Sequence, residues 1–108
     1  MNMKFDFEGQ NVLVVGGTSG INLGVAKGFA KWGANVVVAS RNQVKIDDAV
    51  ESLLELTTIA SGVAFDVRDY KAVEDGFAEA VEFFEGSIDI LVSGAAGNIP
   101  SRLAALSP

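Results

Sequence analysis

An apolar run that leads directly into a glycine-rich turn constrains the fold of this chain more than any other feature. Residues 11–24 read NVLVVGGTSGINLG, with four glycines within nine positions. The run at 11–15 does not alternate, which indicates a strand covered on both faces. Apolar residues then recur at helical spacing up to Trp32, which we assign to packing, and Gly33 ends the helix; they are Ile21, Val25, Ala26, Phe29 and Ala30.

The same alternation of strand and helix continues through the chain. Further apolar strands are predicted at 35–39, 63–65 and 88–92, with amphipathic helices at 43–57 and 69–84. Short apolar strands separated by helices are typical of right-handed crossovers and a parallel sheet. We therefore predict an α/β fold. The predicted architecture is a Rossmann-type parallel sheet with helices on both faces and strand order 3-2-1-4. This sheet is expected to be incomplete, with its remaining strands missing from the sequence.

Composition limits the class of protein. The 108 residues fit one domain, and the net charge of −6 argues against a nucleic-acid partner. The sequence contains neither cysteine nor histidine, so disulfides, thiolate chemistry and the usual metal ligand are excluded. The first ten residues are too polar for a signal peptide, and no apolar run reaches the ~18 residues of a membrane span. The expected location is the cytoplasm, without a membrane partner.

The position of the glycines predicts a phosphate site. In an open parallel sheet, ligands bind beyond the carboxyl ends of the strands, where this turn also meets a helix N-terminus. Unpaired N–H groups and the helix dipole favour an anion there, and glycine lets the backbone approach it. The alternative is a tight turn with nothing bound. A nucleotide-triphosphate loop is excluded because no Gly-Lys-Ser/Thr follows, and a flavodoxin-like loop would need more hydroxyls.

Three motifs in order resemble the short-chain dehydrogenase/reductase family. They are GGTSGI at 16–21, Asp66-Val67 after the third strand, and DILVSGAAGN at 89–98. The resemblance implies a dinucleotide site built from all three. Around the pyrophosphate and the adjoining ribose it places Gly16, Thr18, Ser19, Gly20 and Ile21. At the adenine it places Asp66 and Val67, and under the ribose and nicotinamide it places Ala95, Ala96 and Gly97.

Three positions depart from the family pattern. Val15 replaces a threonine, Asn22 replaces the last glycine of the loop, and Ser93-Gly94 replaces an Asn-Asn pair. Asparagine still accepts a positive φ, so binding is compatible with Asn22. The stretch Ala95-Ala96-Gly97-Asn98 resembles the 2,4-dienoyl-CoA reductase branch of the family.

The residues after the second strand bear on the cofactor. An acidic residue there would bind the ribose 2′-hydroxyl of NAD, but this chain has Ser40, Arg41 and Asn42. A guanidinium can hold a 2′-phosphate through two hydrogen bonds, whereas a carboxylate would repel it. Ser40, Arg41 and Asn42 are therefore assigned to the cofactor, and NADP(H) is favoured over NAD(H). The alternative is a solvated arginine at a strand end.

Two aspartates and one tyrosine remain to be assigned. Asp69 is expected to cap the helix that follows, whereas Asp66, at the carboxyl end of a strand, is assigned to the adenine. The family's catalytic Tyr-x-x-x-Lys would lie after the fourth strand. Tyr70 is the only tyrosine, and Glu74 rather than lysine follows four positions later. No catalytic residue is therefore assigned in this chain.

The predicted function is that of an NADP(H)-dependent oxidoreductase of the short-chain type, represented by its cofactor-binding part. Hydride would pass to or from a carbonyl, an alcohol or an enoyl- or dienoyl-CoA substrate. The alternative is a non-catalytic nucleotide-binding module. The fourth strand is apolar on both faces, with only Asp89 to guard an open edge. We therefore expect residues 1–108 to be the N-terminal part of a longer protein, inactive alone. The remainder or a second subunit would cover that strand, and a homo-oligomer is expected when the protein is complete.

Overall fold

The computed structural model describes residues 7–93, which form four strands and three helices in strict alternation. In chain order they are β1 (Asn11–Val15), α1 (Gly20–Lys31), β2 (Asn35–Ser40), α2 (Gln43–Leu53), β3 (Ala60–Ala64), α3 (Tyr70–Phe84) and β4 (Ile90–Ser93). None of the helices within residues 7–93 has the length and apolar character needed to cross a membrane.

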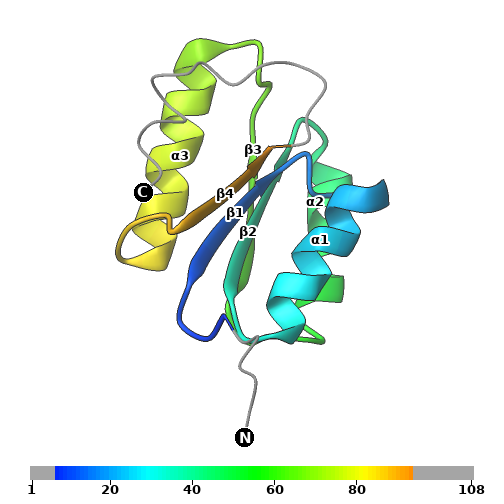
Figure 1. Cartoon of the computed structure of the whole chain (residues 1–108). Coiled ribbons are helices and arrows are strands. Elements are labelled where there is room, and N and C mark those ends of the chain that lie inside the picture. The colour runs from blue at the N-terminus through cyan, green and yellow to red at the C-terminus, as the bar shows by residue number, and fades with distance from the viewer. Residues whose placement is uncertain (1–6, 94–108) are drawn as a thin grey trace, which may run out of the picture.

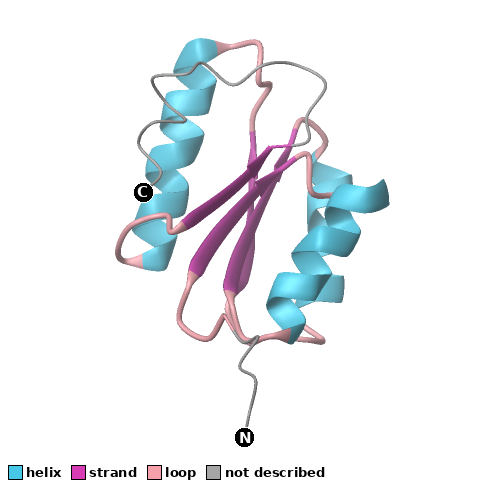
Figure 2. Ribbon diagram, in the orientation of Figure 1, coloured by secondary structure: helices cyan, strands magenta, loops and turns pink. Residues whose placement is uncertain are grey.

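The four strands form one parallel sheet in the order β3-β2-β1-β4. The register pairs Val15 of β1 with Ala39 of β2 on one side and with Ser93 of β4 on the other. Helices α1 and α2 cover one face of the sheet and α3 covers the opposite face (Figure 1). Figure 2 shows the same three layers by secondary structure. The predicted α/β class and strand order are confirmed.

The core is divided by the sheet, because successive side chains of a strand point to opposite faces. Leu13 and Val15 of β1 pack toward α3, together with Phe65 and Phe77. Val12 and Val14 pack toward α1 and α2. All four β1 side chains are essentially inaccessible to solvent. The non-alternating apolar run at 11–15 thus reflects burial on both faces, as the sequence predicted.

Several predicted boundaries and packing roles were wrong. β3 begins at Ala60, not at 63, because pairing with β2 recruits the weakly apolar Ala60-Ser61-Gly62 segment. α2 ends at Leu53 rather than near 57, and β4 begins at Ile90 after the buried Ile88. Trp32, which was assigned to packing, is 48% exposed at the end of α1.

Two glycines allow helices to lie close to the sheet. A Cβ on Gly62 of β3 would collide with the Ile46 side chain of α2. A Cβ on Gly76 of α3 would collide with the ring of Phe65. Helices α2 and α3 therefore lie so close to the sheet that a side chain at Gly62 or Gly76 would not fit.

Candidate functional site

The candidate site lies at the edge of the sheet where the strands reach their carboxyl ends. The glycine-rich turn after β1, residues 40–42 after β2 and residues 65–69 after β3 all follow strands of one parallel sheet. They therefore meet at the same edge (Figure 1). Ligands of open α/β sheets bind at this edge.

The glycine-rich turn has a backbone that its glycines make possible. Gly16 and Gly20 have φ values of 80° and 61°, which lie in the left-handed region. The N–H of Gly16 donates to the carbonyl oxygen of Ala39 at 2.8 Å and fastens the turn to β2. A Cβ on Gly17 would lie 2.9 Å from both Cγ1 and the carbonyl oxygen of Val14. The turn therefore folds back tightly on the end of β1.

The N-terminus of α1 faces this edge without a side-chain cap. Ser19 is its N-cap residue, and its hydroxyl accepts no backbone N–H. By contrast, Asn42 caps α2 through Lys45 N–H at 3.1 Å, and Asp69 caps α3 through Ala72 N–H at 3.1 Å. The first N–H groups of α1 and the positive end of its dipole are therefore available to an anion.

Ile21 lies beside these N–H groups in an unexpected position. Its side chain is 85% exposed, although helical spacing placed it in the packed stripe. That packing assignment was wrong for Ile21, whereas Ala26 and Ala30 are buried as expected. The exposed apolar side chain at the mouth of the turn is compatible with the role that the family resemblance implies.

The three departures from the family pattern have distinct structural contexts. Val15 is buried in the cluster beneath α3, so valine serves the core at this position. Asn22 lies inside α1 and does not have a positive φ, which among the described non-glycine residues occurs only at Glu85. Ser93 is exposed at the end of β4. Gly94 and the assigned Ala95, Ala96 and Gly97 lie outside the described residues.

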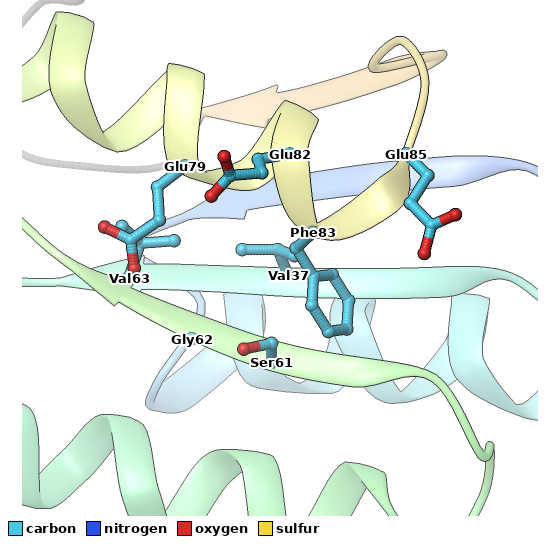
Figure 3. Close-up of a pocket in the computed structure, with 8 residues that line it drawn as sticks. All are labelled: Val37, Ser61, Gly62, Val63, Glu79, Glu82, Phe83 and Glu85. Carbon is cyan, nitrogen blue, oxygen red and sulfur yellow. The ribbon is translucent and has the colours of Figure 1, made fainter.

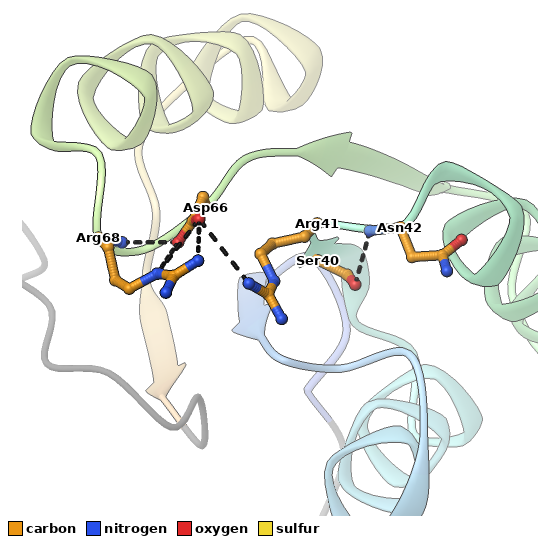
Figure 4. A network of polar contacts seen from close by, with 5 residues as sticks. All are labelled: Ser40, Arg41, Asn42, Asp66 and Arg68. Carbon is orange, nitrogen blue, oxygen red and sulfur yellow. Dashed lines mark hydrogen bonds and ion pairs between the residues drawn. The ribbon is translucent and has the colours of Figure 1, made fainter.

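The three residues assigned after β2 divide into two kinds. The Oγ of Ser40 accepts the Asn42 N–H at 3.2 Å, and the Asn42 side chain is committed to the cap of α2. The guanidinium of Arg41 reaches toward the end of β3, and its side chain is 67% exposed. Arg41 is therefore the residue of the three whose charged group extends over the site (Figure 4).

Asp66 lies between two arginines, and sequence reasoning missed one of them. Its carboxylate accepts hydrogen bonds from the backbone and the guanidinium of Arg68, with Nη2 at 2.8 Å from Oδ2. Nη1 of Arg41 lies 3.9 Å from the same oxygen (Figure 4). The hydrogen bonds from Arg68 lower the pKa of Asp66 to about 2. The signal that could have found Arg68 is its spacing, since a residue two positions after an aspartate can donate to it.

Asp69 and Tyr70 begin α3. The cap predicted for Asp69 is confirmed by its bond to the Ala72 N–H. Tyr70 is the first residue of α3 and packs at the edge of the core, and Glu74 follows one turn later on the same helix. Val67, which the resemblance assigns to the adenine, is half-buried against that same core.

A hollow of about 410 Å³ lies between α3 and β3, away from the glycine-rich turn. Three glutamates border it, with Phe83 beside them (Figure 3); Glu79 and Glu82 lie on α3, and Glu85 follows the end of that helix. Carboxylates repel phosphates, so this hollow does not suit a dinucleotide.

The family model for short chain dehydrogenases matches residues 10–108. The chain belongs to the short-chain dehydrogenase family. Its members are oxidoreductases that bind nicotinamide dinucleotides, and the resemblance seen in the sequence motifs is confirmed.

Known relatives support the same assignment. Gluconate 5-dehydrogenase of Gluconobacter oxydans is 43% identical over 91 residues, which are 84% of this chain and 35% of that enzyme. A peroxisomal 2,4-dienoyl-CoA reductase of Arabidopsis thaliana is 37% identical over 100 residues, 93% of this chain and 33% of that enzyme. The chain therefore spans about a third of the length of these curated relatives.

Solved structures of the family have the same fold. L-sorbose reductase from Gluconobacter frateurii, complexed with NADPH and L-sorbose, superimposes with a TM-score of 0.79 at 34% identity. The match covers 89% of this chain and 36% of that one. A short-chain type dehydrogenase/reductase from Mycobacterium ulcerans gives a TM-score of 0.80 at 28% identity, over 87% of this chain and 35% of that one.

Proposed function

We propose that this chain is the cofactor-binding part of an NADP(H)-dependent oxidoreductase. The observation that carries the proposal is the pairing of an uncapped α1 N-terminus with the exposed guanidinium of Arg41 at one sheet edge. The first suits the pyrophosphate, and the second suits the 2′-phosphate that distinguishes NADP(H) from NAD(H). The NADPH bound to the L-sorbose reductase is consistent with this choice.

Each residue of the site has a proposed role. The turn residues Gly16, Thr18, Ser19, Gly20 and Ile21 surround the pyrophosphate and the adjoining ribose. Arg41 and the hydroxyl of Ser40 hold the 2′-phosphate, while Asn42 fixes the start of α2 beneath it. Asp66 and Val67 contact the adenine, and the family resemblance assigns Ala95, Ala96 and Gly97, outside the described residues, to the ribose and nicotinamide. The bound cofactor would supply or accept a hydride, and these residues position it.

The substrate proposal follows the relatives. Their names include a sugar-acid dehydrogenase and 2,4-dienoyl-CoA reductases, so a carbonyl, an alcohol or an enoyl- or dienoyl-CoA is the expected substrate class. We propose that catalytic residues belong to a further part of the protein. Ile90, Leu91 and Val92 of the edge strand β4 are only partly buried, which suits an additional covering layer.

Assembly and location are also proposals. A homo-oligomer would form when the protein is complete, because a second subunit could add cover beside β4. The cytoplasm stays the proposed location, although the relatives include peroxisomal enzymes.

The cofactor proposal is tested by comparing the dissociation constants of NADPH and NADH for this chain. We expect NADPH to bind more tightly. Arg41→Ala should weaken NADPH binding at least about tenfold, because hydrogen bonds to charged groups contribute about 1.5–3 kcal/mol. Lys45→Ala, which removes another exposed cation on α2, is the matched control and should leave the preference unchanged. Tighter NADH binding, or an unchanged preference in Arg41→Ala, would refute the proposal.

A further inference from the structure

Three charged side chains meet at the candidate site, Arg41 after β2 and Asp66 and Arg68 after β3. The two arginines lie at unequal distances from the Asp66 carboxylate. Asp66 binds Arg68 with Nη2 at 2.8 Å from Oδ2, whereas Nη1 of Arg41 lies 3.9 Å from that oxygen. The first distance is a charge-assisted hydrogen bond, and the second is an ion pair beyond hydrogen-bonding range. Asp66 is thus committed to Arg68 rather than to Arg41 (Figure 4).

Arg68 occupies both oxygens of the carboxylate. Its backbone N–H and its Nε donate to Oδ1 at 2.9 and 3.1 Å. Its Nε and Nη2 donate to Oδ2 at 3.3 and 2.8 Å. The guanidinium therefore grips the carboxylate through two nitrogens, a geometry that lysine cannot reproduce. The aspartate side chain keeps only a third of its surface exposed.

We propose that Arg68 is a positioning residue that sets the preference of this site for a 2′-phosphate by holding Asp66 away from Arg41. The proposal rests on the proposed function, in which Arg41 binds that phosphate. With Asp66 neutralised by Arg68, the guanidinium of Arg41 keeps its donors for a ligand. Without Arg68, Asp66 would pair with Arg41, and a phosphate would have to displace a carboxylate from it.

Charge arithmetic leads to the same expectation. Two guanidinium groups and one carboxylate leave a net charge of +1 in this cluster, which attracts a phosphate dianion. Removal of Arg68 leaves Arg41 and Asp66 with no net charge, and the carboxylate then opposes the phosphate at short range. Arg68 therefore acts in two ways, one through Asp66 and one through its own charge, and the experiment must separate them.

The experiment uses two nucleotide probes that differ only at the position of interest. Adenosine 2′,5′-bisphosphate carries the 2′-phosphate and 5′-AMP lacks it, so the ratio of their dissociation constants cancels contacts to the adenine and the 5′-phosphate. Arg68→Met keeps an unbranched apolar stem but removes the charge and donors, and Arg68→Lys keeps the charge without the two-nitrogen grip. Each is measured with Asp66 and with Asp66→Asn. Lys71→Met is the matched control, since its ammonium pairs with Asp75 instead.

The parent chain should prefer the bisphosphate, and Arg68→Met should reduce that preference about three- to fivefold, in the range of exposed ion pairs. The preference of Arg68→Lys should lie between those of the parent and of Arg68→Met. The preference of Lys71→Met should equal that of the parent. In the Asp66→Asn background, Arg68→Met should reduce the preference clearly less than it does with Asp66, because only the charge of Arg68 is then lost. Urea unfolding of each variant checks that the fold is retained.

Two results would overturn the inference while the proposed function stands. One is a parent preference that Arg68→Met leaves unchanged. The other is an equal reduction with Asp66 and with Asp66→Asn, which would mean that Arg68 acts through its own charge alone. A parent chain that binds 5′-AMP as tightly as the bisphosphate would instead refute the NADP(H) proposal, and this inference with it.

Discussion

Asp89 and Asn11 are joined twice at the amino end of the sheet, although 78 positions separate them. The N–H of Asn11 donates to the Asp89 carboxylate at 2.8 Å, and the N–H of Asp89 donates to the Asn11 carbonyl oxygen at 2.8 Å. The Asn11 side chain also donates to the carbonyl of Ser87 and accepts from the Asn35 amide. Asp89, which the sequence suggested as the guard of the β4 edge, thus fastens the start of β4 to β1.

Asp89→Ala should lower the free energy of unfolding by about 1–2 kcal/mol, because it leaves the Asn11 N–H without its acceptor. Urea unfolding followed by circular dichroism measures the change. Asp75→Ala is the control, since Asp75 pairs with Lys71 across one exposed helical turn and its loss should cost less than about 0.5 kcal/mol. An equal decrease in the free energy of unfolding in the two variants would show that the Asp89–Asn11 hydrogen bond stabilises the fold no more than an exposed ion pair does.

Gly76→Ala should destabilise the fold by about 1–3 kcal/mol, as expected for overpacking of a core. The new Cβ would collide with the ring of Phe65, which is buried in the same cluster as Phe77. Gly28→Ala supplies the contrast, because a Cβ on Gly28 meets nothing within 4 Å on α1. That variant should gain up to about 1 kcal/mol from helix propensity. A stable Gly76→Ala would mean that α3 can shift away from the sheet.

Gly17→Ala should weaken NADPH binding, because it deforms the turn beside the α1 N-terminus. Its Cβ would meet the Val14 backbone oxygen at 2.9 Å, and backbone cannot move aside as a side chain can. Gly24→Ala, one turn into α1, meets nothing within 4 Å and should bind NADPH like the parent. Isothermal titration of both variants provides the test. Parent-like binding by Gly17→Ala would show that the tight turn is not required.

The parts of the fold that follow from local pattern were predictable. The buried run at 11–15, the Asp69 cap of α3 and the sheet order depend on periodicity, local capping and connection rules. The start of β3 was not predictable, because Ala60, Ser61 and Gly62 carry little strand preference and become a strand only by pairing with β2. Pairing between distant segments is invisible to a local reading of the chain.

The candidate site divides in the same way. Its glycines and Arg41 could be found from the sequence, because their residue types are needed for a turn and for a phosphate. The spacing of Asp66 and Arg68 allows the backbone hydrogen bond to be predicted. Which of the two arginine side chains the carboxylate binds could not be predicted, because it depends on their rotamers. Ile21 was assigned to the site from the family resemblance, but helical spacing also placed it in the core. The structure shows that its side chain is exposed instead.

The carboxylate of Asp66 should titrate well below its ordinary value of 3.8, with a midpoint at a pH of about 2. Because the folded pKa is lowered, the contribution of this carboxylate to stability is present above pH 3.8. It is lost as the pH falls through about 2. Carbon-detected NMR of the side-chain carboxyl carbon gives the midpoint directly. Arg68→Met should move the midpoint back toward 3.8, whereas Lys71→Met should leave it in place. A midpoint near 3.8 in the parent chain would contradict the hydrogen-bonded geometry between Arg68 and Asp66.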